Sequence, residues 1–283
     1  MQKLQSKRTR KLLGDCIVYI ILLMLTVIIL IPPVWMLSTA LKDDGEVFKF
    51  PPEWIPEKLQ WANFRRGLTF MPFGKYFFNT TMITLLCTLG NVMSCSLVAF
   101  GFARLRARTR DALFLLVLST MMLPSQVTMI PVFVMFRNLG WIDTFYPLIV
   151  PSFFGNAFYI FLLRQFYMSI PIELDESAKI DGCGPFGIYA KLILPLSKPA
   201  LASVAIFSFM GHWNDFMGPV IYLNSRSKLT VSVALSRFTG MYGLTAWNLL
   251  MAVSLVAVLP CVILFFFTQR YFIQGVVITG LKG

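Results

Sequence analysis

Few side chains in this 283-residue sequence have the types and spacing that covalent or metal chemistry needs. His212 is the only histidine, and the five cysteines form no C-x-x-C pair or other metal-binding spacing. Zinc sites and histidine-dependent catalytic triads require such groups in defined arrangements. The sequence also lacks G-x-x-x-x-G-K-[ST], the loop with which many ATPases bind phosphate. These absences predict a chain that is not an enzyme and that binds no metal or cofactor itself.

Polar side chains within apolar stretches indicate passage of a polar solute instead. Asn214 and Asp215 interrupt one such stretch, and an ionisable group inside a membrane usually faces a cavity because its desolvation is costly. A hydrogen bond between helices or at the membrane interface explains Asp215 equally well. Gln126, close to Pro124 in another stretch, is likewise consistent with a solute path or with helix packing. Both interpretations stay open for these polar residues.

The segment 169–199 contains the most position-specific pattern of the chain, SIPIELDESAKIDGCGPFGIYAKLILPLSKP. Three acidic residues at positions 173, 175 and 176 suit the positive N-terminal end of a helix dipole. Gly182 suits the end of that helix, and Pro185 suits the first turn of a second helix that stops near Pro195. The second piece carries an apolar, aromatic face, which predicts docking to a partner groove or to lipid headgroups.

The composition places these groups in a membrane protein. Charged residues are 13% and hydrophobic residues 57% of the chain, with a mean hydropathy of +0.72, whereas globular domains carry about 25% charged residues. Apolar stretches long enough to cross a bilayer as helix predict an all-α membrane protein with six transmembrane helices. The predicted spans are 16–37, 78–102, 112–134, 141–163, 201–223 and 245–269. Prolines inside several of them predict broken helices, above all in the third.

The positive charge, +12 in total, is concentrated before the first span, between residues 104 and 110, and after the last span. The positive-inside rule therefore places both termini and the segment 169–199 in the cytoplasm. Four arginines at 104, 106, 108 and 110 are expected to set this topology and to contact anionic lipid, which excludes a nucleic-acid role. The predicted organisation is a tail, first helix and outer loop over 1–77, a five-helix core over 78–270 and a cytoplasmic tail over 271–283.

The segment 169–199 resembles the EAA loop of ABC importer permeases. The family pattern is E-A-A, three residues, G, nine residues and I-x-L-P, and this chain departs from it at Ser177 and Leu192. In that family the loop forms two coupling helices that dock into a cleft on a cytoplasmic ATPase. The resemblance implies ATPase-coupling roles for Glu176, Ser177, Ala178, Gly182, Leu192, Leu194 and Pro195. Among them, Glu176 would be the acidic contact, Ala178 a close-packing position, Gly182 the turn between the helices and Pro195 the exit.

Further resemblance covers about residues 73–283 and indicates a carbohydrate-type permease like the second permease of maltose-type transporters. The lead-in over 73–80, the sequence Trp213-Asn214-Asp215 and the C-terminal residues carry it. The resemblance implies a bacterial cytoplasmic membrane location, a second permease subunit, an ATPase dimer that binds ATP and magnesium, and an extracytoplasmic solute-binding protein. It also implies that the tail contacts the ATPase pair, through Gly280, Lys282 and Gly283.

Two other functions remain as alternatives. A self-sufficient secondary transporter or channel predicts more intramembrane charges or broken repeats in corresponding halves, which the sequence does not show. A purely structural anchor fits poorly with polar spans that contain prolines. Among solutes, a sugar, a sugar phosphate and a polyol all stay open.

Overall fold

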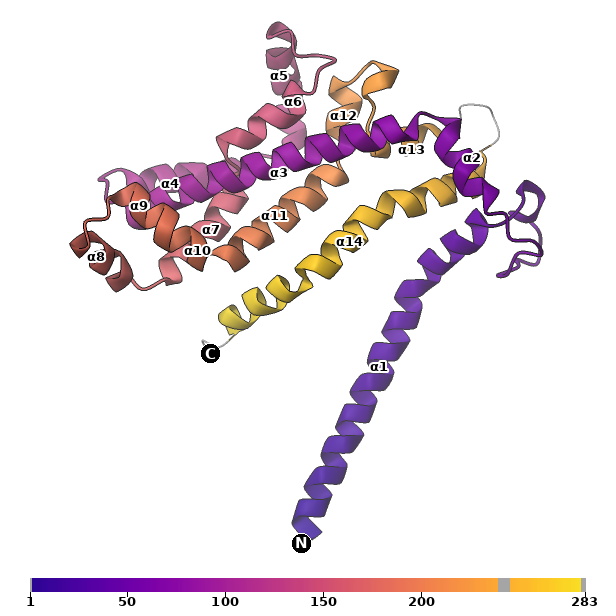
Figure 1. The fold of residues 1–283 in the computed structure, drawn as a ribbon, viewed down its shortest axis with the longest axis horizontal. Coiled ribbons are helices and arrows are strands. Elements are labelled where there is room, and N and C mark those ends of the chain that lie inside the picture. The colour runs from indigo at the N-terminus through magenta and orange to yellow at the C-terminus, as the bar shows by residue number, and fades with distance from the viewer. Residues whose placement is uncertain (1, 239–244, 281–283) are drawn as a thin grey trace. The chain divides into compact units, whose positions relative to one another are not determined.

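The structure, a computed structural model, describes residues 2–238 and 245–280 (Figure 1). The described residues form helices and connecting turns without any strand, which confirms the predicted all-α class. The elements up to the midpoint are α1 Gln2–Ala40, η1 Asp44–Glu46, α2 Ala62–Phe70, α3 Phe73–Arg104, α4 Arg110–Ser119, η2 Thr120–Met122, α5 Ser125–Asn138, α6 Tyr146–Ile149 and η3 Val150–Phe154. The remainder are α7 Ala157–Ser169, α8 Glu173–Ile180, α9 Pro185–Ile188, the π-helix η4 Tyr189–Ile193, α10 Leu194–Leu196, α11 Lys198–Trp213, α12 Met217–Tyr222, η5 Arg226–Lys228, α13 Val231–Phe238 and α14 Trp247–Gly280.

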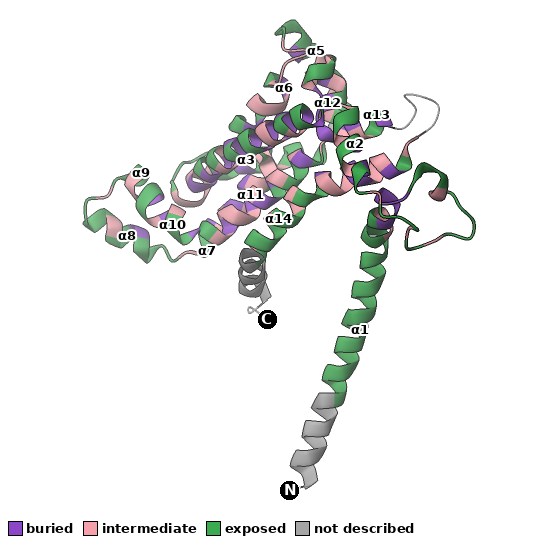
Figure 2. Ribbon diagram, turned by 45° about the vertical axis from the view of Figure 1, so that its right-hand side comes forward, coloured by how far each residue is buried: buried purple, intermediate pink, exposed green. Residues whose placement is uncertain are grey.

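The chain divides into two compact units, Met1–Met71 with Arg237–Val258 and Pro72–Ser236 with Leu259–Gly283. In the first unit, α1 is an apolar helix whose described side chains are exposed along most of its length, as the green ribbon in Figure 2 shows. Its C-terminal end is held by Lys42, a fully buried residue whose ammonium lies 4.4 Å from the centre of the Trp35 ring. The Asn63 amide donates to the carbonyl oxygens of Ala40 and Lys42 at 3.0 and 2.8 Å.

The membrane spans agree only in part with the six predicted from sequence. Four helical segments are long and apolar enough to cross a bilayer, and two sharply bent helix pairs raise the number to at most six within the described residues. The four are Leu13–Ala40, Phe73–Arg104, Tyr146–Ser169 and Trp247–Gln269, and the pairs are Arg110–Met122 with Gln126–Asn138, bent by 101°, and Pro185–Leu196 with Lys198–Trp213, bent by 78°.

Prolines explain only some of the departures from straight spans. Pro124 has no N–H and holds Leu123 in extended backbone, so the predicted third span is interrupted there. The predicted fifth span, 201–223, stops at Trp213 and continues as the separate helix α12. The expectation that prolines break the spans is wrong for α1 and α14, which stay continuous through Pro32, Pro33 and Pro260.

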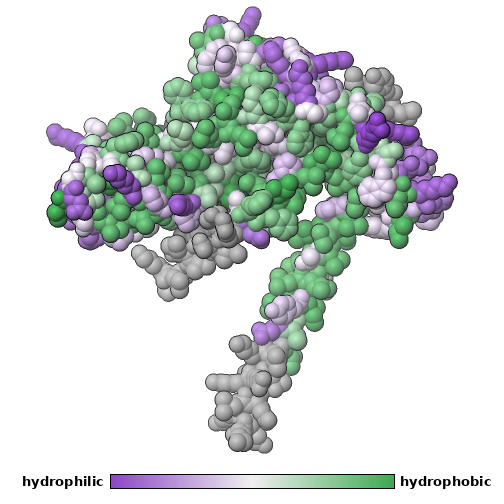
Figure 3. Space-filling view, viewed as in Figure 1, coloured by the Kyte–Doolittle hydropathy of each residue, from purple (hydrophilic) through white to green (hydrophobic). Residues whose placement is uncertain are grey.

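The core of the second unit forms around α3, which packs along both α7 and α11 (Figure 1). Gly90 lets η3 pack closely against α3, because a Cβ at this position would lie 2.8 Å from the Phe153 ring. The surface over the middle of this unit is mainly hydrophobic, and hydrophilic side chains gather at the end that carries α8 and α9 and around α5 and α12 (Figure 3). Such a band is what a hydrocarbon environment requires.

The span Tyr146–Ser169 is broken in its interior at Gly155, whose φ of +92° no other residue type adopts readily. Backbone polar groups freed in this way must find other partners at membrane depth. Side chains of α3 supply them: Cys87 Sγ donates to Leu148 O at 3.2 Å, Ser94 Oγ donates to Ser152 O at 3.1 Å, and Asn156 N–H donates to Cys95 Sγ at 3.1 Å. The break is therefore built into the packing of α3.

Asp143 joins two loops of the second unit through hydrogen bonds and an ion pair. It has a φ of 59°, and its carboxylate accepts hydrogen bonds from the N–H groups of Asn224 and Ser225 and from the Ser225 hydroxyl. Lys228 Nζ lies 3.0 Å from Oδ2 of the same carboxylate. The hydrogen bonds of Ser225, followed by those of Lys228 and Asn224, hold the pKa of Asp143 well below its ordinary value.

Asp143→Asn should lower the Tm of the detergent-solubilised protein by about 2–4 °C. A folded-state pKa below the ordinary 3.8 means that the carboxylate stabilises the fold fully above that value and loses this effect as the pH falls through the lower folded-state pKa. The Tm difference from wild type should therefore be constant near neutral pH and shrink in acid. Asp44→Asn, at an exposed position, is the control. An unchanged Tm at neutral pH would show that the interactions of the Asp143 carboxylate do not stabilise the fold.

Candidate functional site

The segment 169–199 folds into two helical pieces around a glycine turn. Gly182 has a φ of +80°, and its N–H donates to Lys179 O while the Cys183 N–H donates to Ala178 O at 2.9 Å. These two hydrogen bonds form a Schellman motif that ends α8. The predicted helix end at Gly182 and helix start at Pro185 are confirmed. Ser169, the first residue of the segment, is the last residue of α7.

The second piece runs from α9 through the π-helix η4 into α10. The Leu194 N–H donates to Tyr189 O across one more residue than an α-turn contains. A proline ring clashes with the carbonyl four residues earlier in a regular α-helix, and the wider turn precedes Pro195 directly. The chain then bends by 78° into α11, two residues after the predicted exit at Pro195.

Some of the predicted coupling residues of this segment pack against the rest of the chain, and others are exposed. Leu192 and Leu194 are half-buried and, like Ala178, pack against the core of the second unit. Glu176, Ser177 and Pro195 are exposed. Two large apolar side chains also stand out: Ile180 is 87% exposed and Phe186 is 72% exposed, on either side of Gly182. The sequence pattern identified Phe186 and missed Ile180, although its place directly before the glycine turn was a usable signal.

A buried ion pair ties α8 to the end of α3. Arg104 Nε lies 3.6 Å from Asp175 Oδ2, and the two side chains are 5% and 4% exposed. The Arg104 guanidinium also donates to the carbonyl oxygens of Tyr167 and Ile170 at 2.8 and 2.7 Å. The predicted contact of Arg104 with lipid is therefore wrong, because its side chain turns inward to satisfy the end of α7 and the carboxylate of α8.

A second buried polar link joins η4 to the core. Ser96 Oγ lies 2.9 Å from Tyr167 Oη and 2.8 Å from Tyr189 Oη. One side chain of α3 thus bridges α7 and the π-helix. Together with the ion pair of Arg104, it links the segment 173–193 to α3 near both of its ends.

A polar cavity of about 420 Å³ lies inside the second unit, at the break in Tyr146–Ser169. Its volume is in the range of small-molecule sites. Asp215 lines it, and its Oδ1 accepts from the Gly218 N–H at 3.1 Å. The remaining lining residues come from α3, α6, η3, α7, α11 and the turn between η3 and α7: Asn91, Leu148, Pro151, Ser152, Gly155, Asn156, Tyr159, Gly211 and His212.

Only one of the three predicted solute-path residues lines this cavity. Asn214 is exposed and donates to Met210 O at 2.8 Å, and Gln126 lies in the first turn of α5. Asn91 has two roles: its amide donates to Ser208 Oγ of α11 at 3.0 Å, and it borders the cavity. Its Nδ2 also lies 3.2 Å from His212 Nε2.

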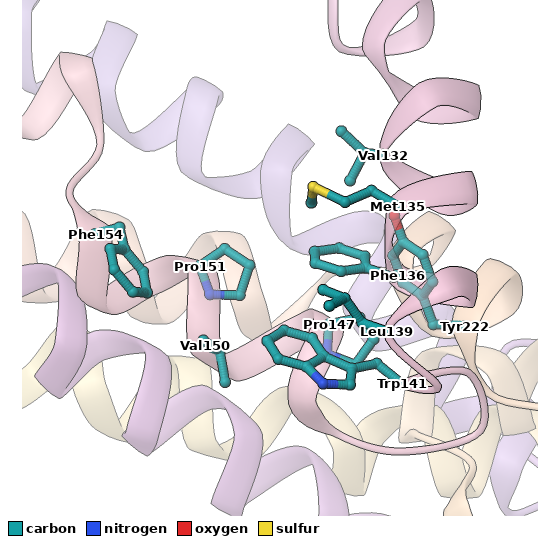
Figure 4. A pocket seen from close by; sticks show the side chains of 10 residues that line it. All are labelled: Val132, Met135, Phe136, Leu139, Trp141, Pro147, Val150, Pro151, Phe154 and Tyr222. Atoms are coloured by element: carbon teal, nitrogen blue, oxygen red, sulfur yellow. The ribbon is translucent and has the colours of Figure 1, made fainter.

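A second cavity, of about 520 Å³, has a different character (Figure 4). Aromatic and aliphatic side chains from α5, α6, η3 and α12 line it, together with Trp141, and none of them is charged. Trp141 stacks on Phe136, with 5.4 Å between the ring centroids, and Val150, Pro151 and Phe154 lie to the left of them in Figure 4. It offers almost no group that could bind sugar hydroxyls, which leaves the cavity of Asp215 as the candidate for a polar solute.

The predicted ATPase-contacting tail is mostly outside the described residues. Lys282 and Gly283 lie beyond them, and Gly280 is the last residue of α14.

An all-helical chain with broken apolar spans, a polar cavity at one break and a projecting helical pair defines a polytopic membrane transport protein. The chain belongs to the family of binding-protein-dependent transport system inner membrane components, which residues 95–278 match. It is accordingly a permease subunit of an ABC importer.

Curated relatives and a solved structure agree with this family. The chain is 35% identical over 209 residues to the arabinooligosaccharides transport system permease protein AraQ of Bacillus subtilis, covering 74% of each chain. It is 31% identical to the polygalacturonan/rhamnogalacturonan transport system permease protein YtcP of the same organism, over 96% of this chain and 99% of the relative. A bacterial ABC transporter involved in the import of the acidic polysaccharide alginate has the same fold, with a TM-score of 0.82, 22% identity and coverage of 92% of this chain and 96% of the other.

Proposed function

We propose that this subunit forms half of the path by which a carbohydrate crosses a bacterial cytoplasmic membrane, and that a separate ATPase subunit drives the passage. Membership of the permease family carries the proposal. The names of AraQ and YtcP, which refer to oligosaccharide and polysaccharide transport, support a carbohydrate solute. The polar cavity at the broken span supplies a place for hydroxyl groups within an apolar unit.

The segment 173–196 is the proposed docking surface for the ATPase. Glu176 offers an exposed carboxylate, and Ile180 and Phe186 offer exposed apolar side chains that water solvates poorly. The positive-inside rule supports a cytoplasmic location for this surface and for both termini. Gly280, Lys282 and Gly283 belong to a tail that reaches the same ATPase pair.

The proposed complex contains this chain, a second permease, two ATPase subunits and an extracytoplasmic solute-binding protein. ATP and magnesium are bound by the ATPase subunits. Closure of the ATPase pair moves the docked segment, and the links of Arg104 and Ser96 pass that movement to α3. The path then opens alternately to the two sides of the membrane.

A mild-detergent pull-down of the tagged chain from its native membrane tests this proposal. The wild-type chain should retain a P-loop ATPase and a second permease, and Gly182→Glu should lose the ATPase while it keeps the second permease. A Cβ at Gly182 meets no atom of this chain within 4 Å, so a side chain there starts in open space and its bulk and charge are expected to act on a docked partner. The positive φ adds backbone strain of about 1–2 kcal/mol for any side chain.

Two variants separate these effects. Gly182→Ala carries the strain with little bulk, and Gly45→Glu adds the same charge at an open site in the first unit. Gly45→Glu should retain both partners. A wild-type chain that purifies alone, and that transports without ATP, would instead support the self-sufficient secondary transporter.

A further inference from the structure

The lining of the Asp215 cavity contains one carboxylate. Asp215 is the only lysine, arginine, aspartate or glutamate among its lining residues. None of the ion pairs among the described residues involves Asp215. The cavity lining thus holds a carboxylate with no lysine or arginine beside it, and His212 is the only other side chain there that can carry a charge near neutral pH.

The local fold keeps that carboxylate in the cavity wall. Its Oδ1 accepts from the Gly218 N–H, and a Cβ on Gly218 would lie 2.5 Å from its Oδ2. Glycine at this position therefore leaves the room that the carboxylate occupies. A carboxylate held in this way accepts two O–H groups at once, as neighbouring hydroxyls of a sugar ring present them.

The rest of the lining suits an uncharged ring with hydroxyl groups. Asn91, Ser152 and Asn156 add amide and hydroxyl groups, while Leu148 and Pro151 add apolar surface for C–H groups. An anion placed in the same cavity would meet a like charge. The arginines that could offset such a charge form a separate surface site of about 310 Å³, lined by Arg106, Ala107, Arg108 and Arg110.

We propose that the cavity around Asp215 selects neutral or cationic hydroxyl-rich sugars and disfavours uronates and sugar phosphates. The inference rests on the proposed carbohydrate transport. It separates this chain from a carrier of acidic sugars, a distinction that family membership leaves open. Asp215 acts as a specificity-determining residue through its charge and its two acceptor oxygens.

A cysteine at Gly211 reports the charge of the cavity directly. Gly211 lines the cavity, and a Cβ there meets no atom within 4 Å. Cys16, Cys183 and Cys261 are replaced by serine, since they are not buried, while Cys87 and Cys95 are buried and remain. The importer complex in nanodiscs is labelled with a cationic trimethylammonium and an anionic sulfonate methanethiosulfonate reagent.

The cationic reagent should react faster than the anionic one by about tenfold, relative to their rates with a free thiol, which is the ratio that 1.4 kcal/mol gives. Asp215→Asn should remove this preference, because the amide keeps an acceptor for Gly218 but carries no charge. Asp44→Asn removes an equal charge from an exposed position outside the cavity and outside the segment 173–196, and should leave the ratio unchanged. A ratio that Asp215→Asn does not alter overturns the inference.

Protection by sugars gives the second measurement. Arabinobiose should slow labelling of Gly211→Cys and digalacturonate should not, whereas digalacturonate should also protect in the Asp215→Asn background. Equal protection of the wild-type cavity by digalacturonate overturns the inference. Uptake of a panel of neutral and acidic oligosaccharides is measured in parallel. If only the acidic oligosaccharides are taken up, the inference is overturned and the proposed function stands. If no oligosaccharide is taken up while the labelling preference for the cationic reagent persists, the proposed function is overturned.

Discussion

Arg104→Met is expected to lower the free energy of unfolding by about 3–5 kcal/mol and to abolish stimulation of the ATPase by the loaded solute-binding protein. The substitution leaves Asp175 as a buried charge without its partner, and it removes the donors to the carbonyl oxygens of Tyr167 and Ile170. Thermal unfolding in detergent measures the first effect. Basal and stimulated ATPase rates of the reconstituted importer measure the second.

Two further variants distinguish loss of stability from loss of coupling. Arg104→Met with Asp175→Leu removes both charges and should recover most of the stability, since no buried charge remains unpaired. It should stay uncoupled, because the ion pair between α8 and α3 is still missing. Arg106→Met, at an exposed position in the same loop, is the control for charge. Normal stimulation in the double variant would show that the pair does not transmit movement.

Ser96→Val is expected to lower the free energy of unfolding by about 2–4 kcal/mol, through the buried phenol groups of Tyr167 and Tyr189. Both hydroxyls use Ser96 Oγ as a partner, at 2.9 and 2.8 Å, and valine offers them only methyl groups. Hydrogen exchange should increase over 185–196, where η4 loses its link to α3. Native-state exchange of the assembled importer checks this.

Ser203→Ala serves as the control for Ser96→Val. The Ser203 hydroxyl donates to Pro199 O within its own helix, so its loss leaves no second side chain without a partner. Adding Tyr167→Phe and Tyr189→Phe to Ser96→Val should restore much of the stability, because the unpaired hydroxyls disappear. Unchanged exchange over 185–196 in Ser96→Val would argue against a link through this serine.

Local sequence signals predicted the projecting segment well. Gly182 and Pro185 mark helix ends through their own backbone preferences, so their roles can be recognised without neighbours. The inward turn of Arg104 could not be recognised in this way. Its partner Asp175 is one of three acidic residues within a single turn, and only the packing of α8 decides which of them faces α3.

Among the interruptions of the spans, too, some could be predicted from local sequence and others could not. Pro124 breaks a span, yet Pro32 and Pro33 lie in a continuous helix, because a missing hydrogen bond bends a helix only where the surroundings favour another path. The break at Gly155 depends on hydrogen bonds from α3, which no local pattern contains. Asp215 was predicted for a solute path because it interrupts an apolar stretch, and it lines the polar cavity just beyond the end of α11 at Trp213.

The π-helix at 189–193 has a consequence for insertions, deletions and chimaeras. Its wide turn holds one residue more than an α-turn, so deletion of any one residue there would yield an ordinary helix. Everything before the deletion would then rotate by about 100° relative to α10. The exposed side chains of Ile180 and Phe186 would both turn with it and point in a new direction relative to α10. A chimaera that exchanges this segment between importers should therefore keep the number of residues in it unchanged, and this matters more than keeping a similar composition.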